Sequence, residues 1–114
     1  TAEQGKPIRE AVDEINGFAN ILEYYHALSA GERGEFANLR GYGRTIVLRR
    51  PLGVCGAIVP WNMPAIIMGW KIGPALTAGN TVILKPATTA PLTCMSLAEI
   101  LEGAGAPDDP SDDL

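Results

Sequence analysis

The span from residue 51 to residue 98 contains no aspartate or glutamate, and its only charged side chains are Lys71 and Lys85. A stretch this long and this poor in charge must either be buried in a folded core or lie in a membrane. Pro60 and Pro64 interrupt it, together with several glycines, and such residues disfavour a membrane-spanning helix. The span therefore predicts buried segments of a globular fold and no membrane partner.

The rest of the composition narrows the class of protein. A chain of 114 residues is about one small domain. Its net charge is -4, with an acidic end at residues 108–113, and this balance disfavours a nucleic-acid partner. The polar first residues do not resemble a signal peptide, and Cys55 and Cys94 fit small buried side chains, so we expect a cytoplasmic setting.

The first half predicts a helix and a strand. Apolar residues recur at intervals of three and four over residues 7–30, which indicates a helix, although Gly17 leaves room for two shorter helices. Residues 31–43 are rich in glycine and charge and predict a loop. Residues 44–50 have the composition of a strand.

The second half predicts a parallel α/β arrangement. Residues 53–59 form a strand buried on both faces, a helix runs from Pro64 to Gly79 with a kink or restart at Pro74, and residues 81–84 form a second strand. A last helix begins at Pro91. Strand, helix, strand and helix in this order predict parallel strands joined by a crossover. Two strands cannot cover their own faces and edges, so we expect a fragment of a larger fold.

Polar residues follow both strands of this unit. Because parallel strands end at the same edge of a sheet, Asn62 and Lys85 are expected to lie near one ligand site. Asn62, between two prolines, fits either an oxyanion-hole donor or the cap of the helix that begins at Pro64. Lys85 fits either a ribose hydroxyl or phosphate ligand or a solvated strand end.

Other chemistry has little support. The G-x-G-x-x-G fingerprint is absent, no spacing of metal ligands occurs, and His26 fits a structural role. Lys71 lies on an otherwise apolar helix and is expected to reach a buried carbonyl or carboxylate, and Trp70 fits either the core or a pocket wall.

Several motifs occur together in one order: Gly53-Val54-Cys55-Gly56, then Pro60-Trp61-Asn62-Met63-Pro64, then Gly79-Asn80-Thr81 and Lys85-Pro86. In this combination the chain, from Gly5 to Pro107, resembles the aldehyde dehydrogenase superfamily. The resemblance implies a partial Rossmann-like parallel sheet flanked by helices. It makes residues 1–107 an incomplete NAD(P)-binding domain, with a possible oligomerisation-arm strand at 44–50 and an acidic, disordered tail at 108–114.

The resemblance also implies roles for individual residues. Asn62 matches the oxyanion-hole asparagine, and Lys71 matches a lysine that supports the surroundings of the catalytic base. Thr88 stands where NAD-preferring members often have glutamate, so we expect NADP to be accepted alongside or ahead of NAD. The implied cofactor residues are Ile58, Val59, Pro60, Trp61, Lys85, Ala87 and Thr88, and the implied substrate tunnel is formed by Met63, Ile67 and Trp70.

The activity implied is NAD(P)-dependent oxidation of a small-molecule aldehyde to a carboxylic acid, through a cysteine thiohemiacetal and a thioacyl intermediate. The cysteine nucleophile and the general-base glutamate of the family lie beyond Leu114, so the isolated chain is expected to be inactive. The resemblance further implies a homo-oligomer, a dimer or tetramer. The alternatives are a nucleotide-binding or interaction module that stands alone, and a related reaction such as acylation of coenzyme A.

Overall fold

The computed structural model describes residues 1–31 and 33–106. It contains three helices, α1 (Ile8–Ser29), α2 (Pro64–Thr77) and α3 (Leu92–Gly103). An antiparallel hairpin is formed by β1 (Glu35–Leu39) and β2 (Gly43–Val47), and a parallel pair by β3 (Val54–Ile58) and β4 (Thr81–Lys85). The predicted α/β class and the parallel pairing are therefore confirmed. The predicted acidic tail, residues 108–114, lies outside the described residues.

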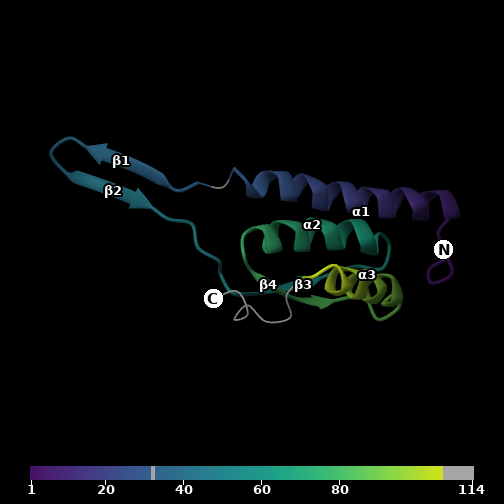
Figure 1. Ribbon diagram of the computed structural model, residues 1–114. Helices are drawn as coiled ribbons and strands as arrows, with labels where there is room; N and C mark the ends of the chain where they lie inside the picture. The colour runs from purple at the N-terminus through teal and green to yellow at the C-terminus, as the bar shows by residue number, and fades with distance from the viewer. Residues whose placement is uncertain (32, 107–114) are drawn as a thin grey trace.

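The hairpin corrects the loop predicted for residues 31–43. Phe36 pairs with Ile46 across the two strands, and the turn between them uses Gly41 and Gly43, whose φ angles are +87° and +100°. Glycine tolerates such angles, so its presence in this segment marks a tight turn between strands. Every residue of both strands is exposed, and the hairpin extends away from the helices (Figure 1).

Helix α1 is a single helix that packs along α2, and Gly17 does not divide it. A Cβ atom added at Gly17 would lie 2.9 Å from Ile66 Cδ1, and one added at Gly73 would lie 2.6 Å from Tyr25 Cδ2. Glycine at these positions therefore allows the close approach of the two helices.

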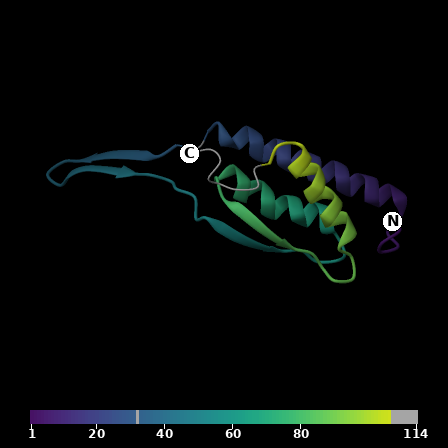
Figure 2. The same ribbon diagram turned by 60° about the horizontal axis from the view of Figure 1, so that its bottom comes forward.

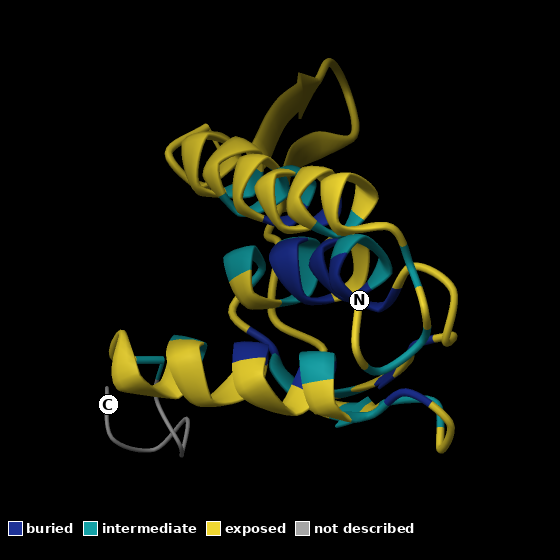
Figure 3. Cartoon of the chain, turned by 90° about the vertical axis from the view of Figure 1, so that its right-hand side faces the viewer, coloured by how far each residue is buried: buried dark blue, intermediate teal, exposed yellow. Residues whose placement is uncertain are grey.

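The buried side of α1 differs from the side that its aliphatic residues suggest. Ile8, Val12 and Ile15 are exposed, whereas Glu14 and Phe18 are buried. Figure 3 shows this division, with the outer side of α1 exposed and the buried residues turned toward α2. Packing against α2 selects the stripe that contains Gly17, because only that stripe permits the close approach.

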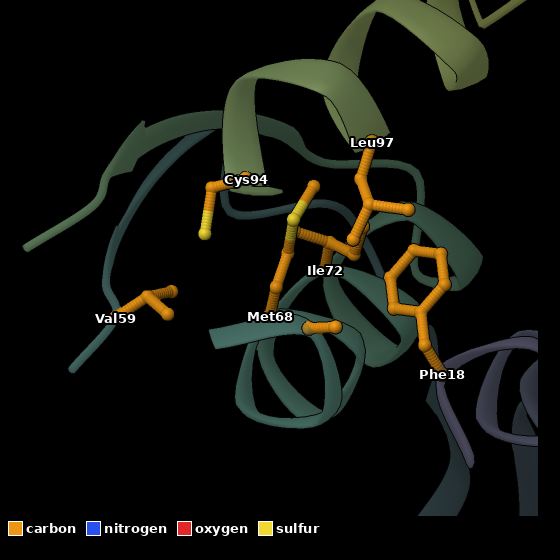
Figure 4. Close-up of a cluster of buried hydrophobic side chains, with 7 residues drawn as sticks. Phe18, Val59, Met68, Ile72, Cys94 and Leu97 are labelled. Carbon is orange, nitrogen blue, oxygen red and sulfur yellow. The ribbon is translucent and has the colours of Figure 1, made fainter. Parts of the chain in front are cut away.

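The core lies between α2, α3 and one face of the β3–β4 sheet (Figure 4). Met68 and Ile72 from α2 meet Val59 from the end of β3 and Cys94 from α3, and Phe18 closes the cluster from α1. Helix α2 is covered on two sides, which explains why its sequence is almost entirely apolar. The helix continues through Pro74 without the predicted restart.

The end of α2 sets the register of the sheet. Gly79, with φ at +76°, ends the helix, and the Asn80 N–H donates to Ala75 O at 2.9 Å. The buried Asn80 side chain then accepts hydrogen bonds from the N–H groups of Leu52 and Gly53, at 2.6 and 3.1 Å. These bonds align the start of β3 with the start of β4.

The opposite face of the sheet is uncovered. Figure 2 shows the two strands side by side, with the helices on one face only. Val54, Ile58 and Ile83 point to the other face and are each about two-thirds exposed, at 69%, 69% and 66%. The expectation that these strands are buried on both faces is therefore not met within this chain, because no described element covers the second face.

Candidate functional site

The candidate site lies where β3 and β4 end. Ile58 and Lys85, the last residues of the two strands, are paired in the parallel register. The next residue, Val59, is buried, and its N–H donates to Lys85 O at 3.0 Å. Segments 59–63 and 86–91 therefore leave the sheet from adjacent positions at its carboxyl edge, which is where ligands bind in open α/β sheets.

Asn62 lies in the first of these segments and does not cap helix α2. The residue at the cap position is Met63, and no side chain of the segment caps the helix. Asn62 is exposed, and its side-chain amide makes no hydrogen bond within the described residues. The cap interpretation of Asn62 is therefore wrong, and its amide is left to face solvent or a ligand.

The first turn of α2 is bound instead by Glu14, a residue of α1. Glu14 Oε1 accepts hydrogen bonds from the N–H groups of Ala65, at 2.8 Å, and Ile66, at 3.4 Å. Pro64 has no N–H, and Met63 has no side-chain oxygen, so this carboxylate replaces a local cap. Glu14 is only 6% exposed.

Lys6 connects this carboxylate to the segment that carries Asn62. Its Nζ forms an ion pair with Glu14 Oε2 and donates to Asn62 O at 2.7 Å. The side chains of Lys6 and Glu14 are 12% and 5% exposed, so the pair is largely removed from water. The sequence patterns do not mark Lys6 or Glu14 as residues of the site. The available signal was Glu14 itself, a carboxylate one helical turn before Phe18 on the same stripe of α1.

The second segment begins at Lys85, which is exposed and whose Nζ donates to Pro86 O at 3.0 Å. Ala87 is half-buried, and Thr88 is exposed. An ammonium and a hydroxyl at this edge fit the hydroxyl and phosphate groups of a dinucleotide. The side chains that face this edge are therefore compatible with the predicted cofactor.

The segment from 86 to 91 leads into α3, whose first N–H groups are bound by Glu3. Glu3 accepts hydrogen bonds from Leu92 N, from Thr93 N at 3.1 Å and from Thr93 Oγ1 at 2.7 Å. Partial burial alone would raise the pKa of Glu3, but the bonds from Thr93 and Leu92, with the nearby amino terminus, leave that pKa below its ordinary value.

The residues predicted to line a substrate tunnel lie at the cap of α2 and along its first two turns. Met63, Ile67 and Trp70 recur at intervals of four and three, so they lie on one side of the helix. Ile67 packs against the core, whereas Met63 and Trp70 are 39% and 56% exposed, so Trp70 is not part of the core that the described residues form. Lys71 is exposed, and within the described residues it reaches no carbonyl or carboxylate.

Of the two cysteines, Cys94 is not suited to nucleophilic attack. Cys94 is fully buried, and burial, with the negative charges of Glu3 and Glu14, raises the pKa of its thiol. Cys55 is half-buried in β3. In residues 1–31 and 33–106, no three His, Cys, Asp or Glu side chains gather in a group that could bind a metal ion. No helix in these residues has the length and hydropathy needed to cross a membrane.

Comparison with known proteins gives one family. The model of the aldehyde dehydrogenase family matches residues 1–110. NADP/NAD-dependent aldehyde dehydrogenase PuuC of Escherichia coli is 43% identical over 109 residues, which cover 95% of this chain and 22% of that protein. The mitochondrial succinate-semialdehyde dehydrogenase of Arabidopsis thaliana is also 43% identical, over 94% of this chain and 20% of its own length.

Solved structures agree with this comparison. The crystal structure of an aldehyde dehydrogenase from Brucella melitensis matches with a TM-score of 0.87 and 40% identity, over 92% of this chain and 22% of that one. The chain thus spans about a fifth of the length of the proteins that it matches.

Proposed function

The chain belongs to the aldehyde dehydrogenase family, and from this membership we propose that it supplies one side of the active site of an enzyme that oxidises an aldehyde to a carboxylic acid. The observation that carries the proposal is the pairing of Ile58 with Lys85 at the carboxyl edge of the sheet. Because of this pairing, the segment that carries Asn62 and the segment that begins at Lys85 leave the sheet from adjacent positions.

In this mechanism Asn62 stabilises the oxyanion. A cysteine thiolate attacks the carbonyl carbon of the aldehyde, and the electron pair of the C=O bond moves to oxygen. The Asn62 side-chain amide donates to that oxygen and binds it more strongly as it becomes an anion. Because the amide has no hydrogen-bond partner within the described residues, it can make this bond without breaking another.

NAD or NADP, when bound, would supply the acceptor for the hydride that is removed from the aldehyde carbon. In the chain itself, Lys85 and Thr88 would bind the ribose hydroxyls or an attached phosphate, and Ile58, Val59, Pro60, Trp61 and Ala87 would line the same edge. Water then attacks the thioester carbon, the carbon–sulfur bond breaks, and the carboxylic acid leaves. The nucleophile and the base that activates water would come from parts of the protein outside these residues.

Three further roles complete the proposal. Met63, Ile67 and Trp70 would face the substrate, because they share one side of α2 directly after Asn62. Lys71, which is exposed and directly follows Trp70, would contact a group outside this chain that supports the catalytic base. Residues 1–107 would form the start of the cofactor-binding domain, since the uncovered sheet face of Val54, Ile58 and Ile83 leaves a surface for more of the same domain.

The test is turnover by the protein that carries this chain, with NAD or NADP and a panel of aliphatic and aromatic aldehydes. We expect formation of the reduced nicotinamide, and we expect Asn62→Ala to lower kcat by roughly 10²–10³ with a smaller change in KM. Asn20→Ala, an exposed amide on α1, is the matched control and should leave kcat unchanged. An Asn62→Ala protein with full kcat would exclude the oxyanion role.

The hairpin is proposed as the contact between copies of the protein. Phe36 and Ile46 form an exposed apolar cross-strand pair, at 63% and 67%, on an element that projects from the body. Exposed apolar pairs of this kind suit an interface. Light scattering after size-exclusion chromatography should show a smaller species for Phe36→Asp with Ile46→Asp, and no change for Thr45→Asp. Equal masses for the wild type, the double variant and Thr45→Asp would exclude the hairpin as the contact between copies.

A further inference from the structure

We infer that Glu14 and Lys6 are positioning residues that fix the direction of the Asn62 side chain. They act by holding the first turn of α2 and the Asn62 carbonyl against α1. This inference rests on the proposed role of Asn62 as the oxyanion donor, and it concerns residues that do not touch the aldehyde themselves.

The backbone of Asn62 needs such support because no described residue close to it in sequence forms a hydrogen bond with it. The segment leaves the sheet at Val59 and enters α2 at Pro64, and Pro60, Trp61 and Asn62 between them are exposed. The only hydrogen bond that Asn62 makes to the described residues is the one from Lys6 Nζ to its carbonyl oxygen, at 2.7 Å. That bond fixes the peptide plane after Asn62, and the side chain leaves from the same Cα.

The helix that follows is fixed by Glu14. The N–H groups of Ala65 and Ile66 have no intrahelical acceptor at this position, and both donate to Glu14 Oε1. A carboxylate is also favoured here by the positive end of the helix dipole. Because Glu14 is buried and belongs to α1, it locks the start of α2 at one position along α1.

Lys6 makes these two contacts depend on each other. A buried carboxylate without a counter-ion is costly, and Lys6 supplies that charge at Glu14 Oε2. The same ammonium donates to the Asn62 carbonyl. Loss of the Glu14 charge therefore releases Lys6 toward water, and with it the carbonyl that Lys6 holds.

The substitution Glu14→Gln removes the negative charge of residue 14 but keeps a side-chain oxygen that can cap α2. The glutamine oxygen can still accept from Ala65 and Ile66, but the amide nitrogen would face the Lys6 ammonium, donor against donor. A displacement of about 1 Å at a reacting group can cost up to roughly 10² in rate. We expect Glu14→Gln to lower kcat about tenfold, because α2 stays capped and only the Asn62 segment is loosened.

The experiment is a double-mutant cycle in the protein that carries this chain, using the aldehyde of the panel that is oxidised fastest. The four proteins are the wild type, Glu14→Gln, Asn62→Ala and the double variant. If Glu14 acts through Asn62, the tenfold loss disappears when Asn62 is already alanine, and the double variant has the kcat of Asn62→Ala alone. A tenfold loss in both backgrounds would overturn the inference, as would an unchanged kcat for Glu14→Gln.

The same cycle separates this inference from the proposed function. If Asn62→Ala leaves kcat unchanged, the oxyanion role fails and the positioning role fails with it. If Asn62→Ala is slow but the effect of Glu14→Gln persists in full, only the positioning role fails. Glu10→Gln is the matched control, since Glu10 is an exposed carboxylate one turn earlier on α1, and its kcat should equal that of the wild type.

A second variant guards against loss of folding. Lys6→Met leaves Glu14 in place and removes the bond to the Asn62 carbonyl. It should show the same loss of kcat and the same absence of effect in the Asn62→Ala background. Amide hydrogen exchange at Ala65 and Ile66 should stay slow in Lys6→Met, which would show that α2 is intact. A normal kcat for folded Lys6→Met would overturn the role of Lys6.

Discussion

Two carboxylates from the first fourteen residues bind the starts of two helices, and their surroundings differ. Glu14 binds α2 in a site that excludes water, and Lys6 neutralises it. Glu3 binds α3 with a similar set of N–H groups, but it remains in contact with water. The helices follow the two segments of the candidate site, so the first segment is held firmly and the second weakly.

This difference separates the segment proposed to act in the chemical step from the segment proposed to bind the nucleotide. The segment that carries Asn62 is fixed by residues of this chain before any ligand arrives, as an oxyanion donor requires. The segment from Lys85 to Thr88 has an ammonium that bonds only the adjacent Pro86 carbonyl. It is therefore free to adapt, and its preference between ligands depends on the few side chains that it exposes.

The largest change in stability is expected when Glu14 is removed. Glu14→Ala leaves two helix N–H groups and the Lys6 ammonium without their partner, and we expect a loss of about 3 kcal/mol in the free energy of unfolding. Glu3→Ala, at the corresponding place on α3, should cost less than about 1 kcal/mol because water replaces the carboxylate. Denaturant unfolding of both variants measures this, and equal losses would contradict the distinction.

The next prediction concerns the close contact between α1 and α2, which places Glu14 at the start of α2. Gly73→Ala would bring a methyl group within 2.6 Å of the Tyr25 ring and push α1 away from α2. We expect a loss of about 2 kcal/mol in the free energy of unfolding, as for other overpacked cores. Gly103→Ala is the control, because an added Cβ meets nothing within 4 Å there, and its stability should be unchanged or slightly higher. Equal stability of the two variants would show that α1 adapts freely.

The sequence predicts the elements that have strong local patterns. The helices that begin near Pro7, Pro64 and Pro91, the strand before Pro60 and the strand after Gly79 are all present within a few residues of their expected bounds. Proline and glycine at the ends of elements act locally, so they can be read without knowledge of the fold.

What could not be predicted depends on contacts between distant residues. The sequence predicts a loop where β1 lies, because the partner that this strand has among the described residues, β2, is found across the turn. The local sequence fits Asn62 as a helix cap, but the acceptor for the first turn of α2 is Glu14, fifty-one residues from Ala65. The buried stripe of α1 contains Glu14 and Gly17, and the contacts that explain both residues are made with α2.

The third prediction concerns the adaptable segment. Thr88→Glu would place a carboxylate beside Lys85, where it can accept bonds from ribose hydroxyls and repel a 2′-phosphate. We expect the ratio of kcat/KM for NADP to that for NAD to fall at least tenfold, about 1.4 kcal/mol. Thr89→Glu adds the same charge one exposed residue further and should change the ratio less. An unchanged ratio for Thr88→Glu would mean that residue 88 does not face the cofactor.

The smallest effect is the pH dependence that Glu3 gives to stability. Its pKa in the folded protein lies below the ordinary value of 4.5, so the folded state favours the ionised carboxylate. The stabilisation is present above pH 4.5 and is lost as the pH falls below 4.5 through the folded-state pKa. The Thr93 hydroxyl and two N–H groups can no longer bond an anion once the proton is bound. Denaturant unfolding of the wild type and Glu3→Gln at about pH 7 and about pH 3 should show a difference that shrinks at the lower pH. A difference that stays constant would mean that ionisation of Glu3 does not contribute to the stability of α3, and the contrast with Glu14 would then rest on burial alone.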